Sequence, residues 1–189
     1  MSLPTIRTGI INAMSTVQDI GLVHGYERYA SKQKDFRTLY LNGQQVLGWF
    51  VRRASTRERT FSAGANEITH QWQIRGYMSL DDEQESELTF DDLLESLRAA
   101  FRDDPTLGGT VETTIVNNEI GLQIEDTGPV MFAGILCHGC RTTLNTQHYE
   151  STEVVEQGEV SNLYVGQSPD IGTGHEPDYQ DAVTGEPPV

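Results

Sequence analysis

Cysteine, basic residues and long apolar runs are all scarce in this 189-residue chain. Two cysteines are too few for the disulfide framework that stabilises small secreted domains. No apolar run approaches the ~20 residues that a membrane-spanning helix requires. The opening residues, MSLPTIRTGI, lack the apolar segment and cleavage site of a secretory signal. We therefore expect a protein made in the cytoplasm, with no membrane partner.

Lysine and arginine are outnumbered by acidic residues, 13 against 28, which gives a net charge of −15. The imbalance is uneven, because residues 151–189 contain eight acidic residues and no Lys or Arg. Residues 1–150 hold the other 20 acids and all 13 bases. Since Lys and Arg make the phosphate contacts of nucleic-acid-binding proteins, this composition disfavours a protein that grips DNA. It suits a surface past which DNA slides without adhering.

The clearest pattern lies between Ile68 and Arg102, and it predicts a strand, an acidic loop and an amphipathic helix. The strand alternates mostly apolar with mostly polar residues, as in a sheet that is covered on one face. The helix has an apolar stripe at three- and four-residue spacing, a plausible N-cap at Thr89, and a stop before Pro105. The simplest packing lays this stripe over the apolar face of the strand. The core residues predicted in this way are Trp72, Ile74, Phe90, Leu93, Leu94, Leu97 and Phe101.

Further segments with helical or strand periodicity flank this unit. Before it we expect a helix over 4–17, an extended link or short strand over 22–29, a helical turn within 31–41, and a strand over 46–53 that residues 57–61 continue past a bulge or turn. After it we expect strands over 111–116 and 120–125, then one long strand from Val130 to about Tyr149.

Strands that do not alternate regularly with helices indicate an α+β fold. We expect an antiparallel sheet of about four to five strands packed against two helices, formed by residues 1–150. Residues 151–189 are acidic and become rich in proline and glycine beyond Ser168. Such a segment buries too little apolar surface to offset its ordering entropy, so we expect an extended or disordered acidic tail that is flexible or ordered on a partner.

Two oppositely charged segments are candidate binding surfaces. The basic one has four arginines within eight residues: Arg52, Arg53, Arg57 and Arg59. The acidic one is the loop before the helix, with Asp81, Asp82, Glu83, Glu85 and Glu87. The arginines are either a solvated hairpin arm or a contact for an acidic partner surface, and the acidic surroundings disfavour DNA phosphates. If the acidic loop is the partner, it belongs either to the same subunit or to a neighbouring copy.

The segment Cys137-His138-Gly139-Cys140 is the most suggestive chemical motif. A zinc ribbon needs a second ligand pair, which the sequence lacks, and a redox C-x-x-C begins a helix. Residues three apart in a strand face opposite sides, so the two thiols should diverge. The sequence also lacks H-E-x-x-H, G-x-S-x-G and a phosphate-binding glycine loop. We expect structural cysteines, no metal, no cofactor and no enzymatic activity, with a small metal-binding or redox domain as the remote alternative.

The order of these segments resembles that of the tail terminator, or tail completion, proteins of long-tailed bacteriophages. The resemblance covers residues 4–150. It lies in the N-terminal helix, the link GLVHGYERY, the WFV strand, HQWQIRGY before the acidic loop, the helix over 90–101 and the late strand MFAGILCHGCRTTLNTQHYE. It implies an α+β subunit that forms a hexameric ring at the tail–neck junction of the virion.

In this family the ring caps the tail tube, stops its polymerisation and presents a surface to the head connector or neck proteins, while DNA passes through its centre without sequence-specific binding. A ring built by head-to-tail contacts needs two different, complementary patches on each subunit. The four arginines and the acidic loop are the predicted pair. The nearer alternative is a neck or head-closure protein at the head–tail junction.

Overall fold

The computed structural model describes residues 2–28, 39–42, 45–62, 64–132, 135–151, 164–165 and 180–181. The chain divides into two units, Met1–Thr152 and Glu153–Val189. In the second unit, the described residues form one antiparallel pair, β9 (Tyr164–Val165) with β10 (Gln180–Asp181). The remainder of the predicted acidic tail lies outside the described residues.

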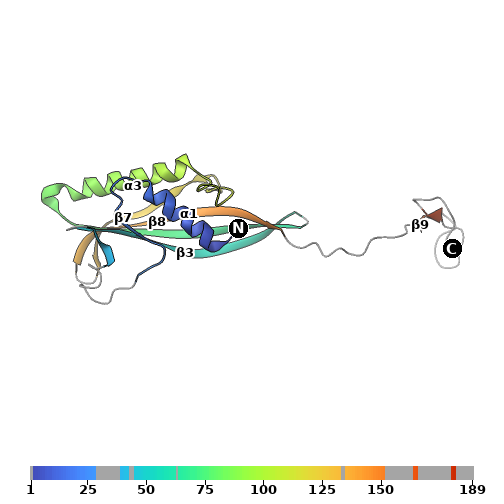
Figure 1. Ribbon diagram of the computed structural model, residues 1–189, viewed down its shortest axis with the longest axis horizontal. Coiled ribbons are helices and arrows are strands. Elements are labelled where there is room, and N and C mark those ends of the chain that lie inside the picture. Colours follow the sequence, from blue (N-terminus) through green and yellow to red (C-terminus); the bar gives the residue numbers. More distant parts are fainter. Residues whose placement is uncertain are drawn as a thin grey trace. The chain divides into compact units, whose positions relative to one another are not determined.

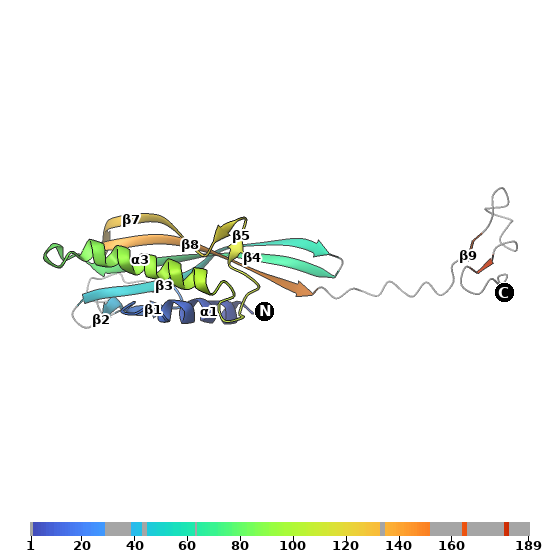
Figure 2. The same cartoon turned by 90° about the horizontal axis from the view of Figure 1, so that it is seen from above.

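The first unit is an α+β fold with one mixed sheet and helices on one of its faces (Figures 1 and 2). In spatial order the strands are β1 (Leu22–His24), β3 (Gln45–Ser62), β4 (Ala65–Ser79), β8 (Ile135–Ser151) and β7 (Leu122–Phe132), and the short strand β2 (Leu41–Asn42) pairs with the start of β3. Strand β1 runs parallel to β3, whereas the other described pairings of this sheet are antiparallel.

The parallel pair corrects the expectation of a purely antiparallel sheet. A parallel pair requires a crossover of a dozen or more residues. The chain between His24 and Gln45 is long enough for one. The predicted helical turn within this connection falls mostly on residues 31–38, which lie outside the described residues. Of its described residues, Leu39 and Tyr40 are helical and Leu41 begins β2.

Two long helices belong to the described part of this unit, α1 (Leu3–Ser15) and α3 (Ser86–Asp103). The helix predicted over 4–17 corresponds to α1, in which the Thr5 N–H donates to the hydroxyl of Ser2 at the N-cap. The predicted stop before Pro105 is confirmed, because α3 ends at Asp103.

The predicted N-cap of α3 at Thr89 is wrong. The helix begins one turn earlier, after the 3-10 turn η1 (Asp82–Gln84), and the residue at its N-cap is Glu85, whose φ of 50° is left-handed. The earlier start is stabilised by Ser86, whose hydroxyl accepts from the Asp81 N–H at 2.8 Å and is hydrogen-bonded to His138 at 2.7 Å. The contact with His138 joins residues 52 apart in sequence, so no local pattern indicated it.

Strands β3 and β4 form one long hairpin. The two strand segments predicted over 46–53 and 57–61 are a single strand, with a register shift between Arg53 and Ser55 that corresponds to the predicted interruption. The predicted faces of β4 are confirmed, since Trp72 and Ile74 are buried in the core beneath the helices and Ile68, on the same face of the strand, is also buried. Beyond Ser55, β3 is exposed along its whole length.

The strands after α3 differ from the prediction in two places. Of the predicted pair over 111–116 and 120–125, only β5 (Ile115–Val116) and β6 (Glu119–Ile120) pair with each other, around two left-handed asparagines, whereas residues 122–125 are the start of β7 and pair with β8. The predicted long strand from Val130 is two strands, because Phe132 ends β7 and pairs with Ile135 at the start of β8. Apolar residues occur on both sides of this reversal, so periodicity alone did not indicate it.

The main core lies between the helices and the sheet. All seven core residues predicted from the sequence are buried there, none more than 9% exposed. Helix α1 adds Ile6, Ile10 and Met14. A smaller cluster lies on the opposite face of the sheet and contains Tyr40, Val46, Phe50, Tyr77 and Cys137. Among the described residues, no helix is both long and apolar enough to span a membrane.

Candidate assembly surfaces

The two cysteines do not form one site. Both are free and buried on β8, with Cys140 in the main core and Cys137 in the cluster on the other face. The predicted divergence of the thiols is therefore confirmed. Burial raises the pKa of both, that of Cys140 to about 12, which disfavours the reactive thiolate. No three His, Cys, Asp or Glu side chains within the described ranges are grouped so as to hold a metal ion.

The face of the sheet that the helices leave open is polar and rich in arginine. Residues directly opposite on paired strands point to the same face, and register places these arginines on it: Arg52, Arg57, Arg59, Arg75 and Arg141. Three are paired with carboxylates: Arg52 with Glu27 at 3.0 Å, Arg59 with Glu67 at 2.7 Å and Arg141 with Glu125 at 2.8 Å. This open face is therefore largely charge-balanced.

The four predicted arginines do not form one patch. Arg52, Arg57 and Arg59 share the open face, whereas Arg53 lies opposite Trp72 and so points to the helix side. Arg57 is exposed, and within the described part of the chain it makes no ion pair. Sequence reasoning missed Glu27 and Glu67 as partners, because the contact between Arg52 and Glu27 depends on folding and that between Arg59 and Glu67 on hairpin register.

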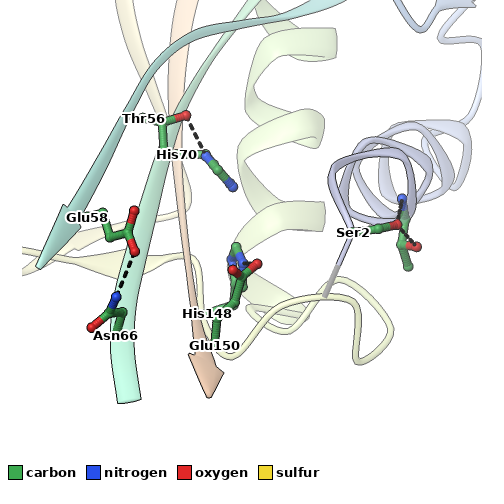
Figure 3. A network of polar contacts seen from close by, with 8 residues as sticks. Ser2, Thr56, Glu58, Asn66, His70, His148 and Glu150 are labelled. Atoms are coloured by element: carbon green, nitrogen blue, oxygen red, sulfur yellow. Dashed lines mark hydrogen bonds and ion pairs between the residues drawn. The ribbon is translucent and has the colours of Figure 1, made fainter. Parts of the chain in front are cut away.

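The end of the β3–β4 hairpin extends past the helices, and we call residues 55–66 the arm (Figure 2). The last residues of β8 pair with the arm as a third strand. Its tip carries an exposed aromatic pair, Phe61 and Tyr149, whose ring centroids are 4.7 Å apart and whose exposed fractions are 60% and 38%. The Asn66 amide donates to Glu58 across the arm at 2.8 Å (Figure 3).

The acidic loop lies at the other end of β4. Four of its five acids are exposed and Asp81 is half-buried. A groove of about 240 Å³ adjoins the loop, with two exposed leucines, Leu80 and Leu88, in its wall and the buried His138 at its base. We call this the leucine groove. Its acidic lining residues are Asp82, Glu85 and Glu87.

The acidic loop does not contact the predicted arginines of its own subunit. Arg59 lies opposite Glu67, and β4 continues for 12 more residues to Ser79 before the loop begins. At ~3.3 Å per residue this separation is roughly 40 Å along the strand. Arg52 and Arg59 are paired with Glu27 and Glu67 instead, and, among the residues that the structure describes, none of the four arginines forms an ion pair with the acidic loop of its own subunit. A solvated arm and pairing with a neighbouring copy both remain predictions.

A buried histidine pair lies where the arm leaves the body (Figure 3). The rings of His70 and His148 are 5.2 Å apart. Nδ1 of His70 is hydrogen-bonded to the Thr56 hydroxyl at 2.8 Å, and Nε2 of His148 lies 3.2 Å from a carboxylate oxygen of Glu150. Burial, followed by the proximity of His148 and Arg53, lowers the pKa of His70 to about 4. The imidazole of His70 is therefore neutral in the folded protein near pH 7.

No protein-family model matches the chain, and no curated protein matches it significantly. What the protein does is therefore inferred from its order of segments and from the two surfaces at the ends of β4. The arm carries both arginines and carboxylates, whereas the groove is bordered by carboxylates, and both surfaces carry exposed apolar side chains.

Proposed function

We propose that this protein is a structural component of a phage virion. It caps the tail tube, terminates tube polymerisation and forms the interface through which the tail joins the head connector. The observation that carries the proposal is the placement of two unlike surfaces, the arginine-bearing arm and the acidic leucine groove, roughly 40 Å apart on one continuous strand. Such a subunit supports head-to-tail self-association, which closes into a ring when the rotation between copies allows it.

The charge of the open face is compatible with a ring through which DNA passes. Arginines bind phosphate tightly when they are free to displace its counterions. Here Arg52, Arg59 and Arg141 already hold carboxylates of the same subunit, and the whole chain has a net charge of −15. A lumen lined by such a surface offers DNA little to hold, whichever strands face inward. The hexameric copy number comes from the resemblance in segment order.

Electron microscopy of particles assembled without this gene tests the proposal. We expect heads with no attached tail, together with tail tubes of abnormal and variable length. Supplying the intact gene in trans is the control and should restore complete particles. Tails of normal length that fail to join heads would instead assign the protein to the neck or head-closure step. Intact particles with normal tails would contradict a role at the head–tail junction.

A further inference from the structure

Two exposed apolar features lie at opposite ends of β4, and their shapes and charges are complementary. One is the Phe61–Tyr149 pair at the tip of the arm, and the other is the leucine groove beside the acidic loop. We propose that they are the two halves of one contact, in which Phe61 of the aromatic pair of one copy occupies the leucine groove of the next. This contact rests on the proposed ring and names the residues that hold it together.

The groove has room for an aromatic ring. Its volume is about 240 Å³, and an engineered apolar cavity of ~150 Å³ in another protein accommodates benzene. Leu80 and Leu88 are 41% and 60% exposed, so an incoming ring would remove their apolar surface from water. His138 at the base is fixed by its hydrogen bond to Ser86, so this end of the groove is preformed.

The two features differ in their charged neighbours: on the face of the arm that carries Phe61 and Tyr149 there are two arginines and one carboxylate, Glu67, whereas the groove is bordered, among the described residues, by carboxylates without an arginine or lysine. Arg57 and Arg59 project from the same face of the arm as Phe61 and Tyr149. Arg57 is exposed, and the side chain of Arg59 is 73% exposed despite its pairing with Glu67. The groove is bordered by three exposed carboxylates. Complementary charges around an apolar centre steer association and fix orientation.

A second copy of this chain fits the groove better than the chain's own segments do. The arm of the same subunit ends roughly 40 Å from its own groove along β4, so the contact cannot close within one copy. The C-terminal segment 151–189 has eight acidic residues and no Lys or Arg, so the acidic border of the groove repels it. In a chain of copies joined in this way, the first copy has a free groove and the last has a free arm, or the reverse. Ring closure joins these two free ends.

Disulfide trapping in the purified full-length protein tests the contact. We would mix Phe61→Cys protein with Leu88→Cys protein and add a mild oxidant. The native cysteines are buried and do not compete. We expect a crosslinked dimer from the mixture, and a ladder that ends in a closed ring from the protein carrying both changes. The matched control replaces Leu88→Cys by Ile120→Cys, at an apolar residue 52% exposed on β6, and should give no specific crosslink.

Sedimentation of Phe61→Ala protein supplies the second measurement. Because Phe61 is exposed, this variant should keep the thermal stability of the parent while its dissociation constant for self-association rises at least tenfold. If Phe61→Ala protein still forms a ring, and the Phe61→Cys and Leu88→Cys proteins do not crosslink, then the contact is wrong although the ring exists. A protein that stays monomeric at every concentration, with no crosslink, would also overturn it. Whether tails are capped is judged separately, from the particles that lack the gene.

Discussion

The ring of Trp49 occupies the space over Gly76, its partner on the neighbouring strand. A Cβ at position 76 would overlap the six-membered ring of that indole. Trp49 is fully buried and stacks on Phe90 of α3, and its Nε1–H donates to the Ile20 carbonyl at 2.7 Å. Because Gly76 has no side chain, the indole of Trp49 lies directly against β4, and Phe90 of α3 packs on that indole. Gly76 therefore sets how closely α3 approaches the sheet.

We predict that Gly76→Ala destabilises the fold. Trp49 is held by its hydrogen bond to Ile20 and by stacking on Phe90, so moving the indole away from an added methyl group would break one or both contacts. Overpacking of this kind typically costs about 1–3 kcal/mol. Chemical denaturation of the variant and of Gln71→Ala, an exposed position on the same strand, would measure the effect. Equal stability of the two variants would show that the indole has room to shift.

Charge reversal at the arm should weaken self-association. In Arg57→Glu the exposed, unpaired arginine is replaced by a residue that repels the acidic border of the leucine groove. Exposed ion pairs contribute only about 0.2–1 kcal/mol each, so we expect a several-fold rise in the dissociation constant for this variant. Added salt should weaken the self-association of the parent protein and reduce the difference in dissociation constant between parent and variant.

Arg98→Glu on α3 is the matched control for that measurement, because it makes the same charge change on a different exposed surface. Sedimentation velocity at low and high salt would compare the two variants. If Arg57→Glu associates as tightly as the parent protein and salt has no effect, the arginines of the arm play no part in assembly.

The stability of the fold should fall as the pH is lowered from 7 to 5, in part because of His70. Its pKa is about 4 in the folded protein, against 6.5 for an unperturbed histidine. Between these values the unfolded chain binds the proton more tightly, so acid favours unfolding. From these two pKa values the loss of stability between pH 7 and pH 5 is about 1–2 kcal/mol.

One variant distinguishes the contribution of His70 to this pH dependence from that of the acidic residues, which also titrate in acid. The change His70→Asn removes the titrating ring, so the variant should lose less stability than the parent between pH 7 and pH 5. Urea denaturation of both proteins at the two pH values gives the difference. Identical losses in parent and variant would mean that His70 is protonated as easily in the folded state as in the unfolded one.

The two cysteines should react slowly in the native protein and fully once it unfolds. Both thiols are buried and burial raises the pKa of each, so little thiolate is available to attack a disulfide reagent. Thiol titration before and after adding denaturant would measure this, and metal analysis of the same preparation should find no bound zinc or iron. A stoichiometric metal would support the remote metal-binding alternative instead.

Residue spacing was sufficient to predict the core. Trp72 and Ile74 follow the two-residue period of a strand, and Leu94 and Leu97 follow the helical period, and each is buried where that period places it. Such patterns are local, so the sequence displays them directly. The divergence of Cys137 and Cys140 followed from the same alternation.

The features that sequence reasoning missed depend on contacts between distant segments. The start of α3 depends on Ser86 meeting His138, which is 52 residues away in the sequence. The pairing of Arg52 with Glu27 required the connection to β1 to cross over. The Phe61–Tyr149 pair depends on β8 lying beside β4, and neither residue belongs to a recognisable motif.

Strand β8 has a consequence for the order in which the subunit is made. It lies between β4 and β7 and pairs with β4 along all of Ala65–Ser79, yet it is the last strand of the first unit to be synthesised. Until residues 135–151 leave the ribosome, one edge of β4 has no strand beside it, and open edges favour aggregation. Tyr149 arrives with the same strand. A nascent chain thus acquires its complete arm tip only when its sheet is complete, so in the proposed ring an unfinished subunit would not yet carry the Phe61–Tyr149 pair.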